Sequence, residues 1–170
     1  MGVLENPIGD QSIAAQELGM EENIEIAREA IRKSLVLLKN DNVLPLKKDA
    51  KVFITGPGDD GTLGLYDGLA HDKNKIAFEE AKKAGLPTIT VLLSGRPRIV
   101  TEEIVDWDAF VAAWLPGTEG EAVADVLYGD YSFSGKLPLS WPKSVEQIPI
   151  NNDDLGGREP LFKYGFGLKY

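Results

Sequence analysis

The spacing of apolar residues predicts a helix near the start of the chain. Between residues 21 and 39 the apolar side chains recur every three or four positions, at Ile24, Ala27, Ile31, Leu35 and Leu38. This spacing predicts one amphipathic helix over the whole segment. On its polar side Glu29 and Lys33 stand one turn apart, in the order that favours an ion pair.

Runs of β-branched and apolar residues predict strands further along the chain. They cover residues 51–55, 88–93 and 109–114. The run at 88–93 is uninterrupted, which is typical of a strand covered on both faces. A fourth run at 136–141 contains Pro138 and predicts an edge strand.

Helical segments alternate with these strands. We expect a short helix at 76–84, another starting at Thr101, and a third that opens on a Thr118–Glu121 capping box and ends at Gly129. The alternation predicts a three-layer α/β/α sandwich of flavodoxin-like appearance, with a mostly parallel sheet of about four or five strands. We expect residues 1–20 to be a leader or interdomain segment and residues 21–170 to form a single domain.

Charge and composition exclude several classes of function. The 27 acidic residues outnumber the 18 basic ones and give a net charge of −9, which repels phosphate groups. We therefore expect neither nucleic acid nor a membrane as a partner. Cysteine is absent and His71 is the single histidine, so disulfides, thiolate sites and histidine metal clusters are excluded. We expect no metal and no cofactor.

The first 20 residues carry neither the basic nor the apolar region of a secretory signal peptide. No apolar run approaches the roughly 20 residues that span a bilayer. We expect a cytoplasmic protein or a soluble recombinant product.

Several motifs stand in order along the chain. LSGRP, AAWLPGTEGE, GKLPLSWP and YGFGL fill much of the second half, and MGVLENP, SLVLLKNDNVLPL and KVFITGPG precede them. With these motifs the chain resembles the C-terminal α/β sandwich domain of family 3 glycoside hydrolases, the β-glucosidases and glucan exohydrolases. The resemblance implies a (β/α)8 barrel as partner, which holds the nucleophilic aspartate in the family, and a β-glucoside as ligand.

The chain departs from the family pattern after the run at 51–55. Family members continue into an LGxxxGGWT-type segment whose Trp stacks on the sugar. Here Leu63 and Gly64 match, but the Trp position falls at Ala70. The family's next helix and strand, and the loop with the general acid/base glutamate, have no counterpart beyond Lys73. The resemblance thus implies no catalytic residue in this chain and a non-catalytic scaffold.

Three residues are candidates for binding a substrate. Asp59 and Asp60 follow the run at 51–55, and Arg96 follows the run at 88–93. Both positions lie at the carboxyl edge of a parallel sheet, where α/β proteins bind ligands. Adjacent aspartates rarely aim at one point, so we do not expect a catalytic pair, and Arg96 also suits a structural role that ties loops together.

Other charged and aromatic residues have structural explanations. Glu102 with Glu103 and Glu119 with Glu121 fall in first helical turns, where the helix dipole favours acids. Asp153 with Asp154 is a third adjacent pair. Among the tryptophans, Trp114 and Trp141 are expected in the core or in domain packing rather than on a sugar.

Two alternative functions remain open from the sequence. The pattern Gly56-Pro-Gly-Asp-Asp-Gly61 follows a predicted strand, as in a nucleotide-binding module. Asp59 and Asp60 would repel its phosphates, and the glycine-rich residues that follow disfavour the required helix. A nucleotide- or sugar-binding module and a glycosidase that becomes active with a barrel chain are the alternatives to a scaffold. We also expect self-association through the exposed barrel-facing surface.

Overall fold

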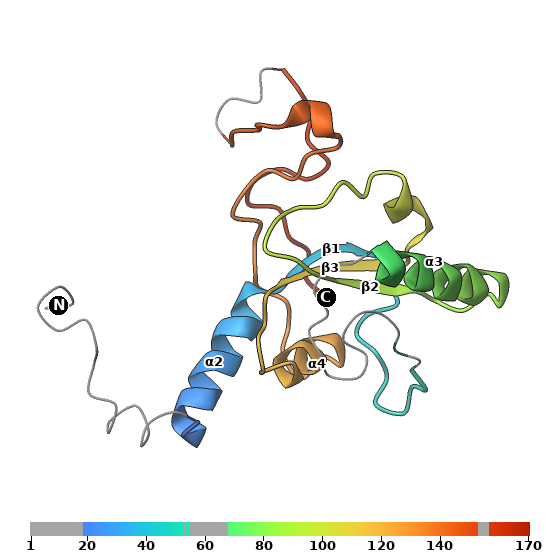
Figure 1. The fold of residues 1–170 in the computed structure, drawn as a ribbon. Helices are drawn as coiled ribbons and strands as arrows, with labels where there is room; N and C mark the ends of the chain where they lie inside the picture. Colours follow the sequence, from blue (N-terminus) through green and yellow to red (C-terminus); the bar gives the residue numbers. More distant parts are fainter. Residues whose placement is uncertain (1–18, 53, 55–67, 153–156) are drawn as a thin grey trace, which may run out of the picture.

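The computed structural model describes residues 19–52, 54, 68–152 and 157–170, with the backbone alone for residues 68–75. In this part of the chain three helices accompany a three-stranded sheet (Figure 1). The helices are α2 (Glu21–Ser34), α3 (Gly68–Lys83) and α4 (Glu121–Leu127). The strands are β1 (Val36–Asn40), β2 (Ile89–Leu93) and β3 (Ala109–Trp114).

The sheet is mixed and has the strand order β1-β3-β2. β2 pairs with β3 in parallel, whereas β1 pairs with β3 antiparallel. The α/β class is therefore confirmed, but the expected four or five mostly parallel strands are not found among the described residues. β1 runs antiparallel because it follows α2 after Leu35 alone and so enters the sheet at the carboxyl edge of β3.

The prediction of one helix through residue 39 is wrong. α2 ends at Ser34, and the next four residues, Leu35 to Leu38, are buried. Leu35 and Leu37 pack on one face of the sheet, while Val36 and Leu38 pack on the other. A strand buries alternate side chains on two faces, and pairing with β3 outweighs the local helical pattern. The predicted Glu29–Lys33 ion pair does form, at 2.5 Å.

Two other predicted strands do not form among the described residues. In the run at 51–55, Val52 and Ile54 lie outside any strand and are 47% and 70% exposed, while Phe53 and Thr55 fall outside the described residues. In the run at 136–141, the chain makes only an isolated bridge at Trp141. Pro138 lacks the N–H that a continuous ladder requires.

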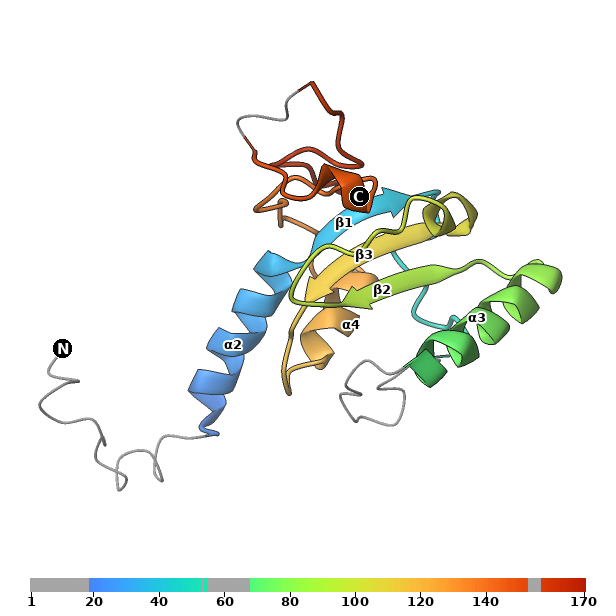
Figure 2. The same cartoon turned by 45° about the horizontal axis from the view of Figure 1, so that its top comes forward.

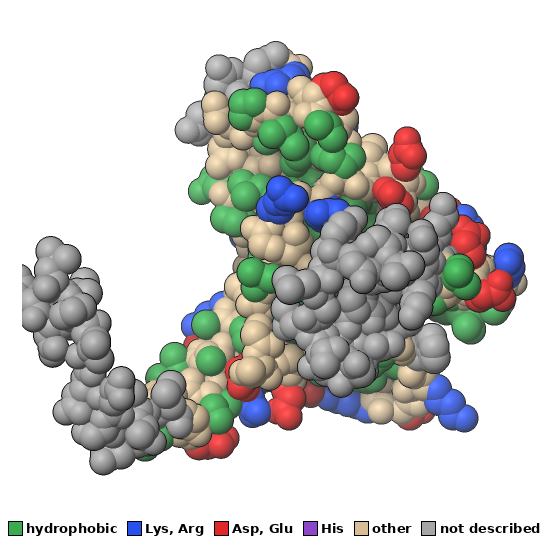
Figure 3. Space-filling model, viewed as in Figure 1, with side chains coloured by type: hydrophobic (Ala, Val, Ile, Leu, Met, Phe, Trp, Pro, Cys, Tyr) green, Lys and Arg blue, Asp and Glu red, His purple; other side chains and the backbone are tan. Residues whose placement is uncertain are grey.

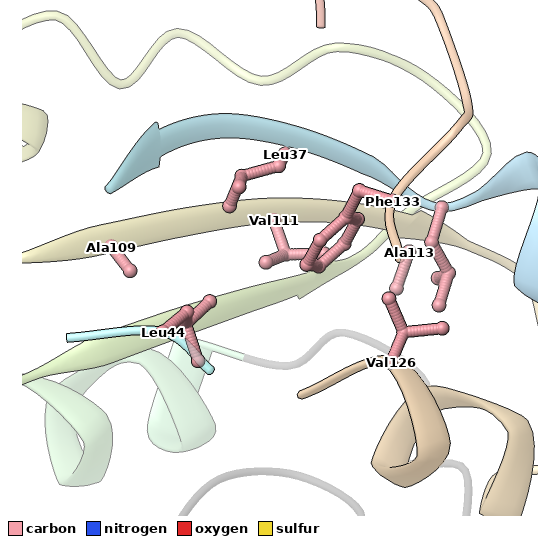
Figure 4. Packing of buried hydrophobic residues seen from close by; sticks show 8 residues of the cluster. Leu37, Leu44, Ala109, Val111, Ala113, Val126 and Phe133 are labelled. Carbon is pink, nitrogen blue, oxygen red and sulfur yellow. The ribbon is translucent and has the colours of Figure 1, made fainter. Parts of the chain in front are cut away.

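One face of the sheet packs against α2 and α4. Figure 4 shows Leu37, Val111 and Phe133 pointing into this cluster from above Val126 of α4. The cluster contains the buried residues Leu35, Leu37, Leu44, Ala109, Val111, Ala113, Val126 and Phe133. Its side chains come from the sheet, from α4 and from two irregular segments, so the first helical layer forms as the sequence predicts.

The other face is covered mainly by irregular chain rather than by helices. Val100 and Ile104 come from the connection after β2, and Leu137 and Trp141 come from the C-terminal segment. Figure 2 shows that segment folded back over β1. The prediction of a helical third layer is therefore wrong for the described residues. Proline and glycine in GKLPLSWP oppose a helix, and aromatic side chains fill the layer instead.

Trp141 is at the centre of this second cluster. Its side chain is fully buried and meets Phe110 edge-on, with ring centroids 5.6 Å apart. The indole Nε1–H donates to the carbonyl of Arg98 at 2.7 Å. A buried Trp needs such a partner, and this bond ties the C-terminal segment to the connection after β2.

The remaining helical predictions are partly correct. The helix expected at 76–84 forms the second half of α3, which ends one residue earlier at Lys83. The helix expected from Thr101 is a 3-10 turn, Glu103–Asp106. α4 ends at Leu127, before Gly129 at φ 79°. The capping box does not form, because the hydroxyl of Thr118 contacts Glu119 rather than a backbone amide at the helix start.

Tyr170 gives the fold a dependence on alkaline pH. Its hydroxyl donates to the carbonyl of Val126, and burial, followed by the charge of Asp130, raises the pKa of the phenol. The unfolded chain then loses this proton first, near pH 10, so the stabilisation is complete below that pH and is lost as pH rises through the folded pKa.

We expect the unfolding midpoint in urea to fall above about pH 10, and Tyr170→Phe to show a shallower fall. Denaturation at a series of pH values measures this. Tyr164→Phe changes an exposed ring and should keep the wild-type slope. Equal slopes in wild type and Tyr170→Phe would contradict the assignment.

Candidate functional site at the carboxyl edge of the sheet

The carboxyl ends of the parallel strands place two loops side by side. β2 ends at Leu93 and continues into Ser94–Pro97, and β3 ends at Trp114 and continues into Leu115. A Cβ built on Gly95 would lie 3.4 Å from Leu115 Cδ1, so the loops touch. Leu93 and Leu115 are 43% and 64% exposed there. This is the edge at which the sequence predicts a site.

Arg96 lies in the first of these loops and is exposed. Ser94 fixes its backbone, because the serine hydroxyl donates to the Arg96 carbonyl at 2.8 Å and accepts from its amide at 3.4 Å. Within the described residues no hydrogen bond or ion pair of its guanidinium is found. The guanidinium is thus exposed at this edge, and a role for Arg96 in binding or in tying loops together stays a prediction.

Trp114 is a feature of this edge that sequence reasoning missed. Its backbone has φ 56°, a left-handed conformation that costs about 1–2 kcal/mol for a residue with a side chain. Its indole Nε1–H donates to the carbonyl of Ser34 at 2.9 Å and joins the end of β3 to the end of α2. The neighbouring LPG sequence indicates a turn, but nothing in the sequence indicates this bond.

The other predicted substrate-binding residues cannot be placed at this edge. Asp59 and Asp60, and the glycine pattern around them, lie outside the described residues. Gly68 and Ala70 fall in the first turn of α3, for which the backbone is described. Asp153 and Asp154 also lie outside the described residues.

Of the two acidic pairs predicted in first helical turns, one is bound to an arginine and the other lies away from the candidate site. Arg28 of α2 binds Glu119 at 3.0 Å and Glu121 at 2.6 Å, so this pair joins α2 to α4. Glu102 and Glu103 are exposed at the start of the 3-10 turn. That turn lies toward the opposite edge of the sheet, because Lys39 near the end of β1 donates to the carbonyl of Ile104 at 3.1 Å.

A second arginine extends the contact between α2 and α4. Arg32 binds Asp125 at 2.7 Å and Glu25 at 2.6 Å, and its guanidinium stacks on the ring of Tyr131. The hydrogen bond to Glu25, followed by that to Asp125, raises the pKa of Arg32. α2 has no fully buried residue, so these ion pairs and the partly buried Ile31 hold it on the domain.

A groove of about 280 Å³ lies at the amino edge, away from the candidate site. It is lined by Lys82, Gly85, Leu86, Pro87, Thr88, Asp106 and Asp108. Lys82 pairs with Asp106 at 2.6 Å, and Asp108 accepts from the Thr88 amide at 2.7 Å. Its charged groups are thus satisfied within the chain, and we assign it no ligand.

The described part of the chain holds no group of three or more acidic or histidine side chains arranged to bind a metal ion. No helix in those residues is long and apolar enough to cross a membrane.

Residues 68–170 match the model of the glycosyl hydrolase family 3 C-terminal domain. The chain belongs to this family. The match begins at α3 and takes in β2, β3, α4 and the C-terminal segment, including both loops of the carboxyl edge.

Curated relatives extend the family 3 assignment to the rest of the chain. The periplasmic β-glucosidase of Salmonella typhimurium is 33% identical, with 76% of this chain and 20% of that protein covered. β-Glucosidase C of Emericella nidulans is 28% identical, with 100% of this chain and 34% of that protein covered. The chain therefore spans between a fifth and about a third of these relatives' lengths.

The second of these alignments also shows that the family 3 relative is longer within the matched region. It runs over 210 residues, whereas this chain has 170, so at least 40 aligned positions have no residue here.

Solved structures agree with the family 3 fold. The exo-1,3/1,4-β-glucanase of a Pseudoalteromonas species superposes with a TM-score of 0.76 at 33% identity, with 90% of this chain and 29% of that one covered. The β-glucosidase of Listeria innocua superposes with a TM-score of 0.74 at 24% identity, with 99% and 37% covered, and supports the fold alone.

Proposed function

We propose that this chain is a shortened C-terminal domain of a β-glucosidase-type family 3 glycoside hydrolase and that by itself it is a non-catalytic scaffold. Its residues 21–170 form the domain, and residues 1–20 form the segment that leads from a (β/α)8 barrel. Docked on the barrel, the carboxyl edge forms one wall of a β-glucoside pocket, with Arg96 and the Asp59–Asp60 pair as candidate sugar contacts.

One observation carries the proposal of a non-catalytic domain. Retaining glycoside hydrolysis needs two carboxyl groups about 5–5.5 Å apart across the sugar. Among the described residues, Glu119 and Glu121 are bound to Arg28, and Glu102 and Glu103 lie toward the opposite edge. The described loops of the carboxyl edge, Ser94–Pro97 and Leu115–Thr118, contain no acidic residue.

The same edge has the surface expected of a docking face. Leu93 and Leu115 are exposed and project from touching loops. Apolar side chains gathered on a surface mark contact sites between domains or proteins. The matches cover only 20% and 34% of the two relatives, so both contain further chain that can cover such a face.

Hydrolysis of an aryl β-glucoside tests the proposal. We expect no turnover above the uncatalysed rate with this chain alone, because neither catalytic carboxylate is in place. An intact family member, such as the Listeria innocua β-glucosidase, serves as the positive control. Turnover by the isolated chain that survives repeated purification and is lost in Asp59→Asn or Asp60→Asn would overturn the proposal.

The barrel region of a relative, added to the same assay, tests the complemented-glycosidase alternative. Restored turnover that depends on Asp59 or Asp60 would assign those residues to catalysis. A thermal-shift screen with nucleotides, flavins and glucosides tests the binding-module alternative, since a ligand that binds only the folded chain raises its Tm. A rise with nucleotides alone would favour that module over a glycosidase scaffold.

A further inference from the structure

The first half of α2 projects beyond the domain. α4 begins at Glu121, and Arg28 binds Glu119 and Glu121 at this start, so the residues before Arg28 extend past the end of α4. Figures 1 and 2 both show α2 running outward from the carboxyl edge of the sheet. We call residues 20–27 the α2 arm.

The α2 arm exposes both acidic and apolar side chains. Glu21 and Glu22 occupy its first turn and are exposed. Met20 and Ile26 are exposed as well, at 48% and 60%. Figure 3 shows hydrophobic and acidic side chains side by side along the projecting helix. Such a surface fits a partner that offers apolar contacts beside a positive charge.

The carboxyl edge of the same chain offers this chemistry. Leu93 and Leu115 are its exposed apolar residues, and Arg96 lies between them in sequence with its guanidinium exposed. The dimensions also agree, because eight helical residues extend about 12 Å. Three strands spaced about 4.8 Å apart give an edge of about 10 Å between the outer strands.

We propose that two copies of the chain associate through reciprocal contacts, with the α2 arm of each copy on the carboxyl edge of the other. Glu21 and Glu22 then face Arg96, and Met20 and Ile26 cover Leu93 and Leu115. In this reciprocal arrangement a two-fold axis relates the two arm–edge contacts, so the assembly closes at a dimer. The dimer rests on the proposed function only because both use the carboxyl edge of the sheet as a docking face.

Sedimentation velocity of the full chain over a range of concentrations tests the dimer. We expect a monomer–dimer equilibrium, and we expect Glu21→Lys with Glu22→Lys to raise the dissociation constant about tenfold or more. The double substitution changes the net charge from −9 to −5, which by itself reduces repulsion between copies. Weaker association against that trend can therefore be assigned to the lost contact.

Reversing the charge of Arg96, on the carboxyl-edge side of the proposed contact, completes the test. Arg96→Glu alone should also weaken the dimer, and its combination with Glu21→Lys and Glu22→Lys should restore it. Glu102→Lys with Glu103→Lys makes the same charge change toward the opposite edge and should not weaken it. Leu115→Asp, at an exposed position, should weaken the dimer without lowering the Tm measured at a concentration where the wild type is monomeric.

Several outcomes would overturn the proposal. They are a monomer at every concentration, assembly beyond a dimer, no recovery in the triple variant, and equal weakening by the Glu102–Glu103 control. The measurement uses this chain alone, so its result is independent of whether a barrel restores glucosidase activity.

Discussion

Replacing Trp141 with alanine is expected to lower the free energy of unfolding by about 4 kcal/mol. The fully buried indole contacts Phe110 and Phe162 edge-on and fills the centre of the second core cluster. Its removal leaves a cavity under the C-terminal segment and deletes the hydrogen bond from the indole to the Arg98 carbonyl. A domain of this size has about 5–15 kcal/mol in total, so much of its stability would be lost.

Urea denaturation followed by circular dichroism measures the Trp141 effect. Trp141→Phe retains an aromatic ring but loses the Nε1–H bond, so we expect a smaller loss of about 1–2 kcal/mol. Tyr164→Ala removes an exposed ring and should change the stability by about 0.5 kcal/mol or less. A Trp141→Ala variant as stable as Tyr164→Ala would show that the C-terminal segment does not close the core.

Gly135→Ala is expected to destabilise the fold by about 3 kcal/mol. A Cβ at this position would lie 2.3 Å from the carbonyl oxygen of Leu35 and 2.9 Å from that of Ser34. Both atoms belong to the backbone that links α2 to β1, so the clash cannot be relieved by a side-chain rotation. Either this link or the C-terminal segment must move.

Thermal unfolding compares Gly135→Ala with two matched glycine variants. At Gly120 a Cβ meets nothing within 4 Å, and at Gly95 it makes an ordinary contact of 3.4 Å with Leu115. Both of these alanine variants should keep a Tm close to that of the wild type. If Gly135→Ala also did so, the close approach of the C-terminal segment to Leu35 would be refuted.

Local sequence patterns correctly predicted the elements in which the spacing of apolar residues matches the side chains that are buried in the fold. The run at 109–114 is buried as β3, and the polar–apolar spacing from residue 21 gives α2. The same spacing misled beyond Ser34, because Leu35 to Leu38 fit both a helical stripe and a strand buried on two faces. Pairing with β3, about 70 residues away in sequence, decides between them.

The sequence likewise predicted some features of the candidate site and missed others. The run at 88–93 and the LSGRP motif after it predicted one loop at the carboxyl edge, and the structure shows that this loop touches Leu115. The capping box failed because the hydroxyl of Thr118 contacts Glu119 and because Arg28 binds both Glu119 and Glu121. The local sequence around Thr118 does not reveal the contact with Arg28, which lies far away in the chain. The left-handed backbone of Trp114 and its bond to Ser34 likewise depend on residues 80 positions apart.

The sequence by itself determined the family, the α/β class, and the absence of cysteine and of a histidine cluster, because ordered motifs and composition are properties of the chain alone. Only the tertiary structure decided that β1 is a strand, that irregular chain covers the second face, and that arginines hold α2 on α4. These features depend on contacts between distant segments, whose free energies exceed the small local preferences that a sequence pattern expresses.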